Sequence, residues 1–121
     1  MAELRIEDDQ LILHLTPAEK VEGVHGDLHA PLSALVAVEV LDDAHEPVCI
    51  RSGIKIGTRI PGFLEVGTIQ GLTRRVFAAV HHDTPRGIRV RLEDCAFDEW
   101  IVGCVDPEAT AAQVRGVIRP S

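Results

Sequence analysis

The amino-acid sequence predicts an α+β fold that is mainly β, with about seven short antiparallel strands followed by a C-terminal helix. Three observations support this fold class. Short apolar stretches alternate with turn residues along most of the chain, as in antiparallel sheets. The last apolar stretch has helical spacing instead. The 121 residues, 45% hydrophobic and 26% charged, contain no repeat or linker, so we expect one domain over residues 1–121.

The strand pattern is clearest in residues 88–92. Ile88, Val90 and Leu92 alternate there with two arginines, which is typical of a strand with one solvated face. In residues 35–41 we expect valines 36, 38 and 40 to point inward, because the alternate positions include Glu39. The seven expected strands cover residues 4–7, 11–15, 35–41, 63–69, 75–80, 88–92 and 99–105.

Two segments carry helix start signals. Thr16, Pro17 and Glu19 supply a hydroxyl cap, a proline at the first helical position and an acid at the third, which predicts a short helix near residues 17–24. Asp106 and Pro107 begin the terminal helix in the same way. The apolar face of the terminal helix is formed by residues at helical spacing: Ala111, Val114, Val117 and Ile118.

Residues 50–62 interrupt the strand pattern. Glycines at three positions and a Pro61-Gly62 turn signal predict a long ordered loop rather than a continuous strand. Because Arg51, Lys55 and Arg59 recur in this loop, it is the best candidate for contact with a partner. The alternative is that the isoleucines of the loop, Ile54, Ile56 and Ile60, merely pin it over the core.

Charge is distributed unevenly within a formal net charge of −7. Residues 1–50 carry 2 Lys/Arg and 11 Asp/Glu, residues 51–91 carry 8 and 2, and residues 92–121 carry 2 and 6. Such asymmetry can mark an anion-binding surface. We favour the interpretation that strands of opposite charge lie side by side and pair across the sheet. The acidic total argues against nucleic-acid binding, which needs a basic surface.

Motifs that carry chemistry are weak. Cys49, Cys95 and Cys104 are an odd number without C-x-x-C spacing, which predicts reduced thiols in a cytoplasmic protein. The start MAELRIEDDQ predicts no secretory signal. His81 and His82 form the most metal-like run, but adjacent strand residues point to opposite faces, so we expect no metal. No nucleophile elbow or phosphate-loop spacing occurs, and we expect neither an enzyme nor a cofactor.

Three segments and the order of the elements carry a resemblance to a known superfold. The segments are PLSALVAV at 31–38, GTRIPG at 57–62 with VGT at 66–68, and VGCVDP at 102–107. Together they resemble bacterial pleckstrin-homology-like (PH-like) domains. The resemblance covers about residues 4–118 and implies a barrel of about seven antiparallel strands in two near-orthogonal sheets, capped by the C-terminal helix.

Phosphoinositide-binding members of that superfold place basic residues in the first hairpin loop. Here the loop at residues 7–10 reads EDDQ, and its negative charge would repel a phosphate. We therefore expect no membrane recruitment of that kind.

The expected function is a non-enzymatic, cytoplasmic PH-like module that binds a protein or peptide partner or a second copy of itself. The candidate contact residues are Arg51, Lys55, Arg59, Arg74 and Arg75. Peptide binding in this architecture can use strand addition, expected at the sheet edge beside the terminal helix.

Two alternatives remain open. The first is a binder of anions or phosphorylated small ligands that uses the basic region 51–91. It requires Lys55 and five arginines to converge on one face: Arg74, Arg75, Arg86, Arg89 and Arg91. The second is an enzyme, which requires a cleft with a histidine beside a cysteine or serine.

Overall fold

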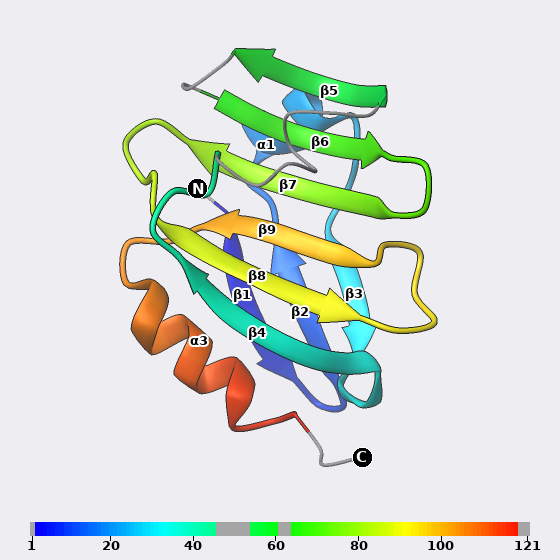
Figure 1. The fold of residues 1–121 in the computed structure, drawn as a ribbon, viewed down its shortest axis with the longest axis vertical. Coiled ribbons are helices and arrows are strands. Elements are labelled where there is room, and N and C mark those ends of the chain that lie inside the picture. The colour runs from blue at the N-terminus through cyan, green and yellow to red at the C-terminus, as the bar shows by residue number, and fades with distance from the viewer. Residues whose placement is uncertain (1, 46–53, 61–63, 119–121) are drawn as a thin grey trace.

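The structure, a computed structural model, describes residues 2–45, 54–60 and 64–118. These residues form two open sheets and two helices (Figure 1). The small sheet has the order β1-β2-β3, with β1 at Glu3–Glu7, β2 at Gln10–His14 and β3 at Leu28–Pro31. The large sheet has the order β4-β8-β9-β7-β6-β5. Its strands are β4 at Leu35–Leu41, β5 at Ile54–Ile60, β6 at Leu64–Gln70, β7 at Arg75–His81, β8 at Gly87–Leu92 and β9 at Glu99–Gly103.

The helices form where the cap signals predict them. In α1, Pro17–Gly23, the Thr16 hydroxyl accepts the Glu19 N–H at 3.2 Å while the Glu19 carboxylate accepts the Thr16 N–H at 2.9 Å. This reciprocal pair is a capping box. In α3, Pro107–Arg115, Asp106 Oδ1 accepts the Ala109 N–H at 3.1 Å. A single 3-10 turn, Leu32–Ala34, connects β3 to β4.

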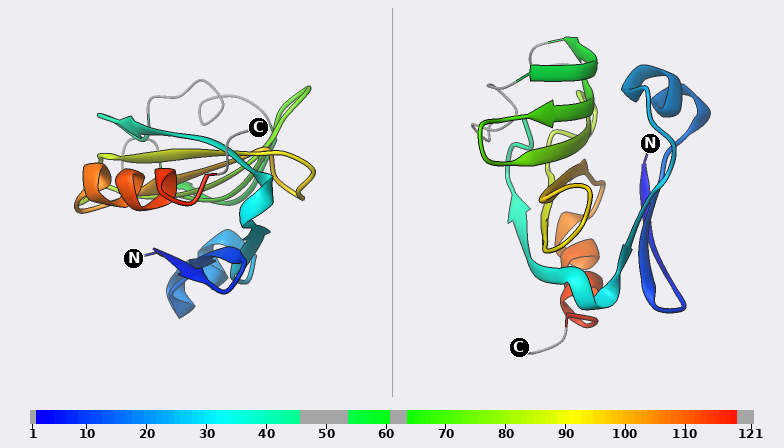
Figure 2. Two further views of the ribbon diagram at one scale, coloured as in Figure 1. Left: turned by 90° about the horizontal axis from the view of Figure 1, so that it is seen from below. Right: turned by 90° about the vertical axis from the view of Figure 1, so that its right-hand side faces the viewer.

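The molecule has two layers (Figure 2). The small sheet and α1 lie against one face of the large sheet, and the strands of the small sheet run across those of the large one (Figures 1 and 2). The main core lies between the layers, and α3 closes it beside β4 and β8. Ala111 and Val114 of α3 are buried, as predicted. Val117 and Ile118 also pack against this core, but they follow the end of the helix at Arg115 and do not belong to its apolar face. The aromatic side chains of this core are Phe77, Phe97 and Trp100, and its fully buried members include Leu11, Leu13 and Ile88.

The central strands of the large sheet are buried on both faces. In β7, Phe77 and Ala79 belong to the main core. The alternate residues of β7 belong to a second apolar cluster on the opposite face, whose members are Ala44, Ile69, Val76, Ala78, Val80 and Ile101. Because β7 is apolar on both faces, it has the near-continuous hydrophobic sequence of a doubly covered strand.

The predicted loop over residues 50–62 is wrong where the structure describes it. Residues 54–60 form β5, which pairs with β6 along its whole length. The glycine that suggested a break, Gly57, lies directly opposite Gly67 of β6. A Cβ on Gly57 would lie 2.2 Å from the Val66 carbonyl oxygen. The glycine therefore lets two strand backbones approach each other and does not end the strand.

Other expectations need correction. There are nine described strands rather than seven, because β3 and β5 join the expected set. The sheets are open rather than closed into a barrel, since β4 and β5 form free ends of the strand order. The pair β7–β9 is parallel, because β8 lies two strand positions from β7 and runs opposite to it, and β9 turns back from β8 into the gap between them. Val36 is exposed, because a bulge between Leu35 and Ala37 turns its side chain outward.

Replacing Gly57 with alanine should lower the free energy of unfolding by about 2 kcal/mol or more. The residue has a φ of +142°, and the added methyl group would meet backbone of β6. Urea unfolding of Gly57→Ala measures the change. Gly26→Ala is the matched control, because a Cβ there has no neighbour within 4 Å. Equal stability of the two variants would contradict this role of Gly57.

Candidate functional site

The structure separates the residues that the sequence nominated as contacts. Arg51 lies outside the described residues. Lys55 and Arg59 both lie on β5, whereas Arg74 ends the turn between β6 and β7. Arg75 begins β7 and points to the other face, where its guanidinium carbon lies 4.8 Å from the centre of the Phe97 ring. Two regions therefore need separate treatment: a groove beside Arg74 and the outer edge of β5.

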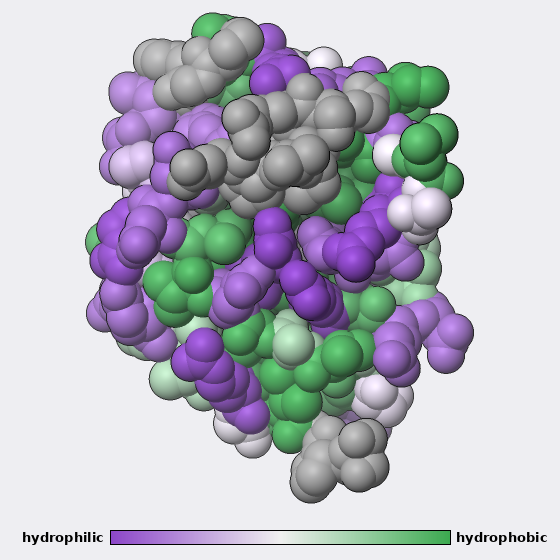
Figure 3. Space-filling model, viewed as in Figure 1, coloured by the Kyte–Doolittle hydropathy of each residue, from purple (hydrophilic) through white to green (hydrophobic). Residues whose placement is uncertain are grey.

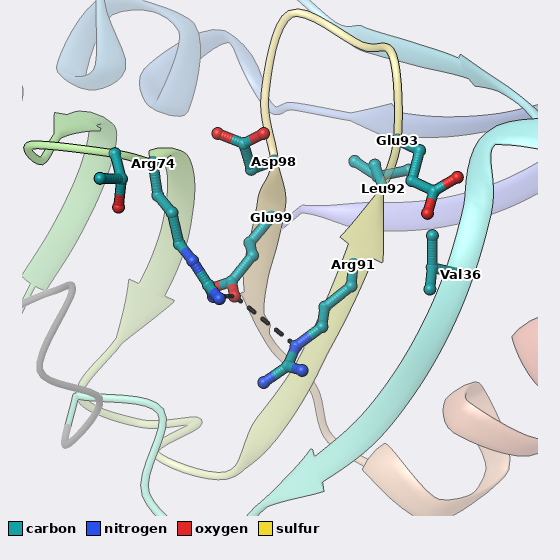
Figure 4. A pocket seen from close by; sticks show the side chains of 8 residues that line it. Val36, Arg74, Arg91, Leu92, Glu93, Asp98 and Glu99 are labelled. Carbon is teal, nitrogen blue, oxygen red and sulfur yellow. Dashed lines mark hydrogen bonds and ion pairs between the residues drawn. The ribbon is translucent and has the colours of Figure 1, made fainter.

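The groove beside Arg74 is organised by a buried carboxylate (Figure 4). Arg74 from the β6–β7 turn and Arg91 from β8 both reach toward Glu99 of β9. Arg74 Nη1 donates to Glu99 Oε1 at 2.5 Å, and Arg91 Nε lies 3.6 Å from the same oxygen. Glu99 is only 2% exposed. The groove has a volume of about 280 Å³, and its lining also includes Val36, Thr73, Leu92, Glu93 and Asp98.

A third arginine completes this network. Arg89 Nε lies 3.6 Å from Glu99 Oε2, and Arg89 Nη1 donates to Glu39 at 2.6 Å. Several of these ion pairs join residues directly opposite each other on neighbouring strands, which confirms the predicted cross-strand pairing of charge. The opposed pairs are Glu39–Arg89, Arg91–Glu99 and Arg59–Glu65.

The arginines of the basic region do not gather on one anion site. Arg86 pairs with Glu108 and lies 3.7 Å from Asp42, away from the groove. The groove itself carries Glu93 and Asp98 in addition to Glu99. Figure 3 shows hydrophilic side chains gathered over the middle of this face, where β8 and β9 lie in Figure 1. Positive and negative groups are thus mixed there, and the arginines are largely occupied by carboxylates of the chain itself.

The two edges of the large sheet differ. At the β4 edge, Arg115 of α3 donates to the Val38 carbonyl oxygen at 3.3 Å, and α3 packs alongside. The expected site of strand addition beside the terminal helix is therefore covered by that helix. At the opposite edge, β5 has β6 on one side and, among the described residues, no strand on the other (Figure 1).

Three residues of β5 direct their backbone N–H and C=O groups toward this open edge. A Cβ on Gly67 would lie 2.2 Å from the Ile56 carbonyl oxygen, so the peptide groups of Ile56 face β6. In an antiparallel ladder, successive residues direct their N–H and C=O groups to opposite sides. The N–H and C=O groups of Lys55, Gly57 and Arg59 therefore point away from β6.

The side chains of β5 divide into two chemically distinct sets. Ile54, Ile56 and Ile60 share a face with Thr58, whose hydroxyl donates to the Glu22 carbonyl oxygen of α1 at 2.9 Å. These isoleucines are 72%, 53% and 49% exposed, so they do not pin the segment over the core. Lys55 and Arg59 lie on the other face. The outer edge of β5 thus presents an apolar row and a cationic row.

The helix that packs against β5, α1, is followed directly by a further exposed apolar residue. Val24 follows the helix and is 69% exposed. It has φ 51° and ψ 44°, a left-handed conformation that is unfavourable for a β-branched residue. An exposed valine is kept here in a position where glycine is the usual residue.

One buried carboxylate lies beside the cationic row. Glu65 of β6 is opposite Arg59, and Arg59 Nε lies 3.2 Å from Glu65 Oε1. Burial raises the pKa of Glu65 to about 6, although the nearby charges of Arg59 and Lys55 partly oppose this shift. Lys55 forms no ion pair with any residue that the structure describes. The row therefore keeps a net positive charge.

A smaller pocket lies between the β8–β9 loop and the segment before β3. His25 packs there against Phe77 and Phe97, with ring centres 5.4 and 5.6 Å apart, and Cys95 lines the same pocket. Burial raises the pKa of Cys95 and also that of Cys104, which disfavours the reactive thiolate. Within residues 2–45, 54–60 and 64–118, no cluster of His, Cys, Asp and Glu side chains is suited to hold a metal ion.

The described helices are also too short, or too polar, to cross a membrane. Comparison with family models, curated proteins and solved structures found no match to this chain. The feature that sequence reasoning missed is the strand character of residues 54–60. The signal was present as the alternation of three isoleucines and a threonine with lysine, glycine and arginine, which is a strand pattern once Gly57 is accepted within it.

Proposed function

We propose that this chain is a non-enzymatic binding module that takes up an extended segment of a partner protein by strand addition to β5. The observation that carries the proposal is a seven-residue edge strand with exposed isoleucines, whose outward peptide groups pair with no strand among residues 2–45, 54–60 and 64–118. Edge strands are normally shortened, charged or covered to prevent pairing with other chains, but β5 is seven residues long and carries its charges on one face only, while its other face exposes three isoleucines. An added strand would satisfy the outward N–H and C=O groups, as in known β-augmentation complexes. Cytoplasmic location and a PH-like relationship belong to the same proposal and rest on the sequence.

The alternatives have less support. An anion binder would need arginines available to a ligand, and Arg74, Arg89 and Arg91 are engaged with Glu99 and Glu39. An enzyme would need an activated nucleophile, and the raised pKa values of Cys95 and Cys104 oppose one. At the outer edge of β5, by contrast, no described strand or helix has to move before a segment can pair.

The proposal predicts that Lys55→Pro weakens binding about tenfold without unfolding the protein. Proline removes an N–H that points to the open edge, and it leaves the hydrogen bonds between β5 and β6 in place. Random seven-residue peptides displayed on phage, selected on the wild-type chain, provide the probe. Selected peptides should bind Lys55→Pro about tenfold more weakly than Lys55→Gln, since an intermolecular backbone hydrogen bond is lost.

Lys55→Gln is the matched control, because it removes the same charge and keeps the N–H. Thermal unfolding of both variants shows whether the fold is preserved. Equal affinity of the two variants for the selected peptides would exclude strand addition at this edge. If the selected peptides bind another part of the chain, so that neither variant weakens their binding, strand addition at this edge is excluded as well.

A further inference from the structure

We infer that the segment bound by β5 alternates acidic and apolar residues, with its acidic side chains beside Lys55 and Arg59 and its apolar side chains beside the isoleucine row. This inference rests on the proposed strand addition and adds the chemistry of the partner. Side chains of paired strands lie next to each other on each face of a sheet. The two faces of β5 therefore select the two residue types separately.

Charge complementarity supports the acidic half. Lys55 has no ion-pair partner among the described residues, and Arg59 shares one buried carboxylate, that of Glu65. A partner carboxylate beside Lys55 would form a cross-strand ion pair of the kind that Arg59, Arg89 and Arg91 of this sheet already have. Opposite charges across strands are favourable, and like charges directly opposite each other are unfavourable.

The same charges disfavour a second copy of this chain as the occupant. In an antiparallel pair of β5 strands, the register that pairs all seven residues places its two-fold axis at Gly57. Lys55 of one copy then lies opposite Arg59 of the other, and the contact occurs twice. Shorter registers avoid this repulsion only by leaving part of the edge unpaired.

The exposed isoleucines support the apolar half. Ile54, Ile56 and Ile60 lie on the face next to α1, and Val24 adds an exposed apolar side chain close to the carbonyl that Thr58 binds. Water-exposed apolar rows of this length are characteristic of interaction surfaces. Apolar side chains on alternate residues of an added strand would cover this row.

Three fluorescent seven-residue peptides test the inference: one alternating valine and glutamate, one alternating valine and lysine, and one alternating serine and glutamate. Each peptide is held at nanomolar concentration while the full chain is added, and fluorescence anisotropy reports binding. We expect the valine–glutamate peptide to bind about tenfold more tightly than either of the others, given two charge contacts and several apolar ones. Lys55→Glu should reduce this preference and improve binding of the valine–lysine peptide.

The outcomes separate the partner chemistry from the strand addition. If all three peptides bind equally and Lys55→Pro weakens all of them, strand addition stands and the inferred chemistry is wrong. If the valine–glutamate peptide binds best but Lys55→Pro and Lys55→Gln behave alike, the charges act without strand addition, and the proposed function is wrong. No binding of the valine–glutamate peptide, or a dimer of the chain in sedimentation that Lys55→Pro abolishes, would overturn the inferred occupant.

Discussion

Glu99→Ala should lower the free energy of unfolding by about 3 kcal/mol, because removing one member of a buried ion-pair network leaves its partners uncompensated. The Glu99 side chain is 3% exposed and lies within 3.6 Å of three guanidinium groups. Arg74 and Arg91 can turn toward water, but Arg89 is largely buried and its Nε has no other hydrogen-bond partner among the described residues. Most of the loss should therefore arise at Arg89, whose Nη1 keeps Glu39 as a partner but whose buried Nε faces no other carboxylate among the described residues.

Urea unfolding measures this effect, with the m-value as a check on two-state behaviour. Glu93→Ala is the matched control, because Glu93 lines the same groove and is exposed. The control should change stability by less than about 0.5 kcal/mol. A loss below about 1 kcal/mol for Glu99→Ala would mean that the arginines are solvated well enough without their carboxylate.

Glu19→Ala should lower the free energy of unfolding by about 3 kcal/mol, because three donors lose one acceptor group. Glu19 is 1% exposed and accepts the Ala2 N–H at 3.0 Å, the Thr16 N–H at 2.9 Å and His81 Nε2 at 2.8 Å. It therefore connects the N-terminal segment, the start of α1 and the end of β7. Glu22→Ala, on the same helix, is the control and should have a small effect.

The contribution of this pair should depend on pH. The hydrogen bond to Glu19 raises the pKa of His81 above 6.5, although burial opposes the shift. Burial by itself would raise the pKa of Glu19, but the hydrogen bonds from His81 and Thr16 prevail and lower it below 4.5. Stability from His81 is complete below 6.5 and is lost as pH rises through its raised pKa. Stability from Glu19 is present above 4.5 and is lost as pH falls through its lowered pKa.

The difference in stability between the wild type and Glu19→Gln should therefore be largest between pH 4.5 and 6.5. Glu22 of α1 also raises the pKa of His81. The stability difference should therefore decline gradually at the upper end of this pH range. Unfolding free energies at several pH values measure the difference. A difference that does not change with pH would show that Glu19 acts as a hydrogen-bond acceptor alone.

Local signals in the sequence predicted the elements that depend on local interactions. The caps at Thr16 and Asp106 correctly locate both helices, and the alternation at 88–92 correctly locates β8. The bulge beside Val36 was not predictable, because one extra residue in a strand leaves no mark in the hydrophobic pattern. The role of Gly57 depends on Gly67, ten residues away and on the next strand. A glycine that permits close approach of backbones looks, in the sequence, like a glycine that breaks a strand.

The candidate site was predictable only in part. Lys55 and Arg59 were nominated as contacts in a loop and instead lie four residues apart on one face of β5; their role as contacts stays a prediction. Arg74 and Arg75 are adjacent in the sequence but lie on opposite faces of the large sheet, so they cannot act together. The burial of Glu99 by three arginines depends on the order β8-β9-β7, which includes a parallel pair that no local pattern specifies.

Amide hydrogen exchange of β5, followed residue by residue by NMR, tests the central claim most directly. In the free chain, the amides of Lys55, Gly57 and Arg59 should exchange rapidly, whereas those of Ile56 and Thr58 should be protected by β6. Saturation with the valine–glutamate peptide should slow the first three and leave the other two unchanged. Unaltered exchange at Lys55, Gly57 and Arg59 in the saturated complex would contradict strand addition at this edge.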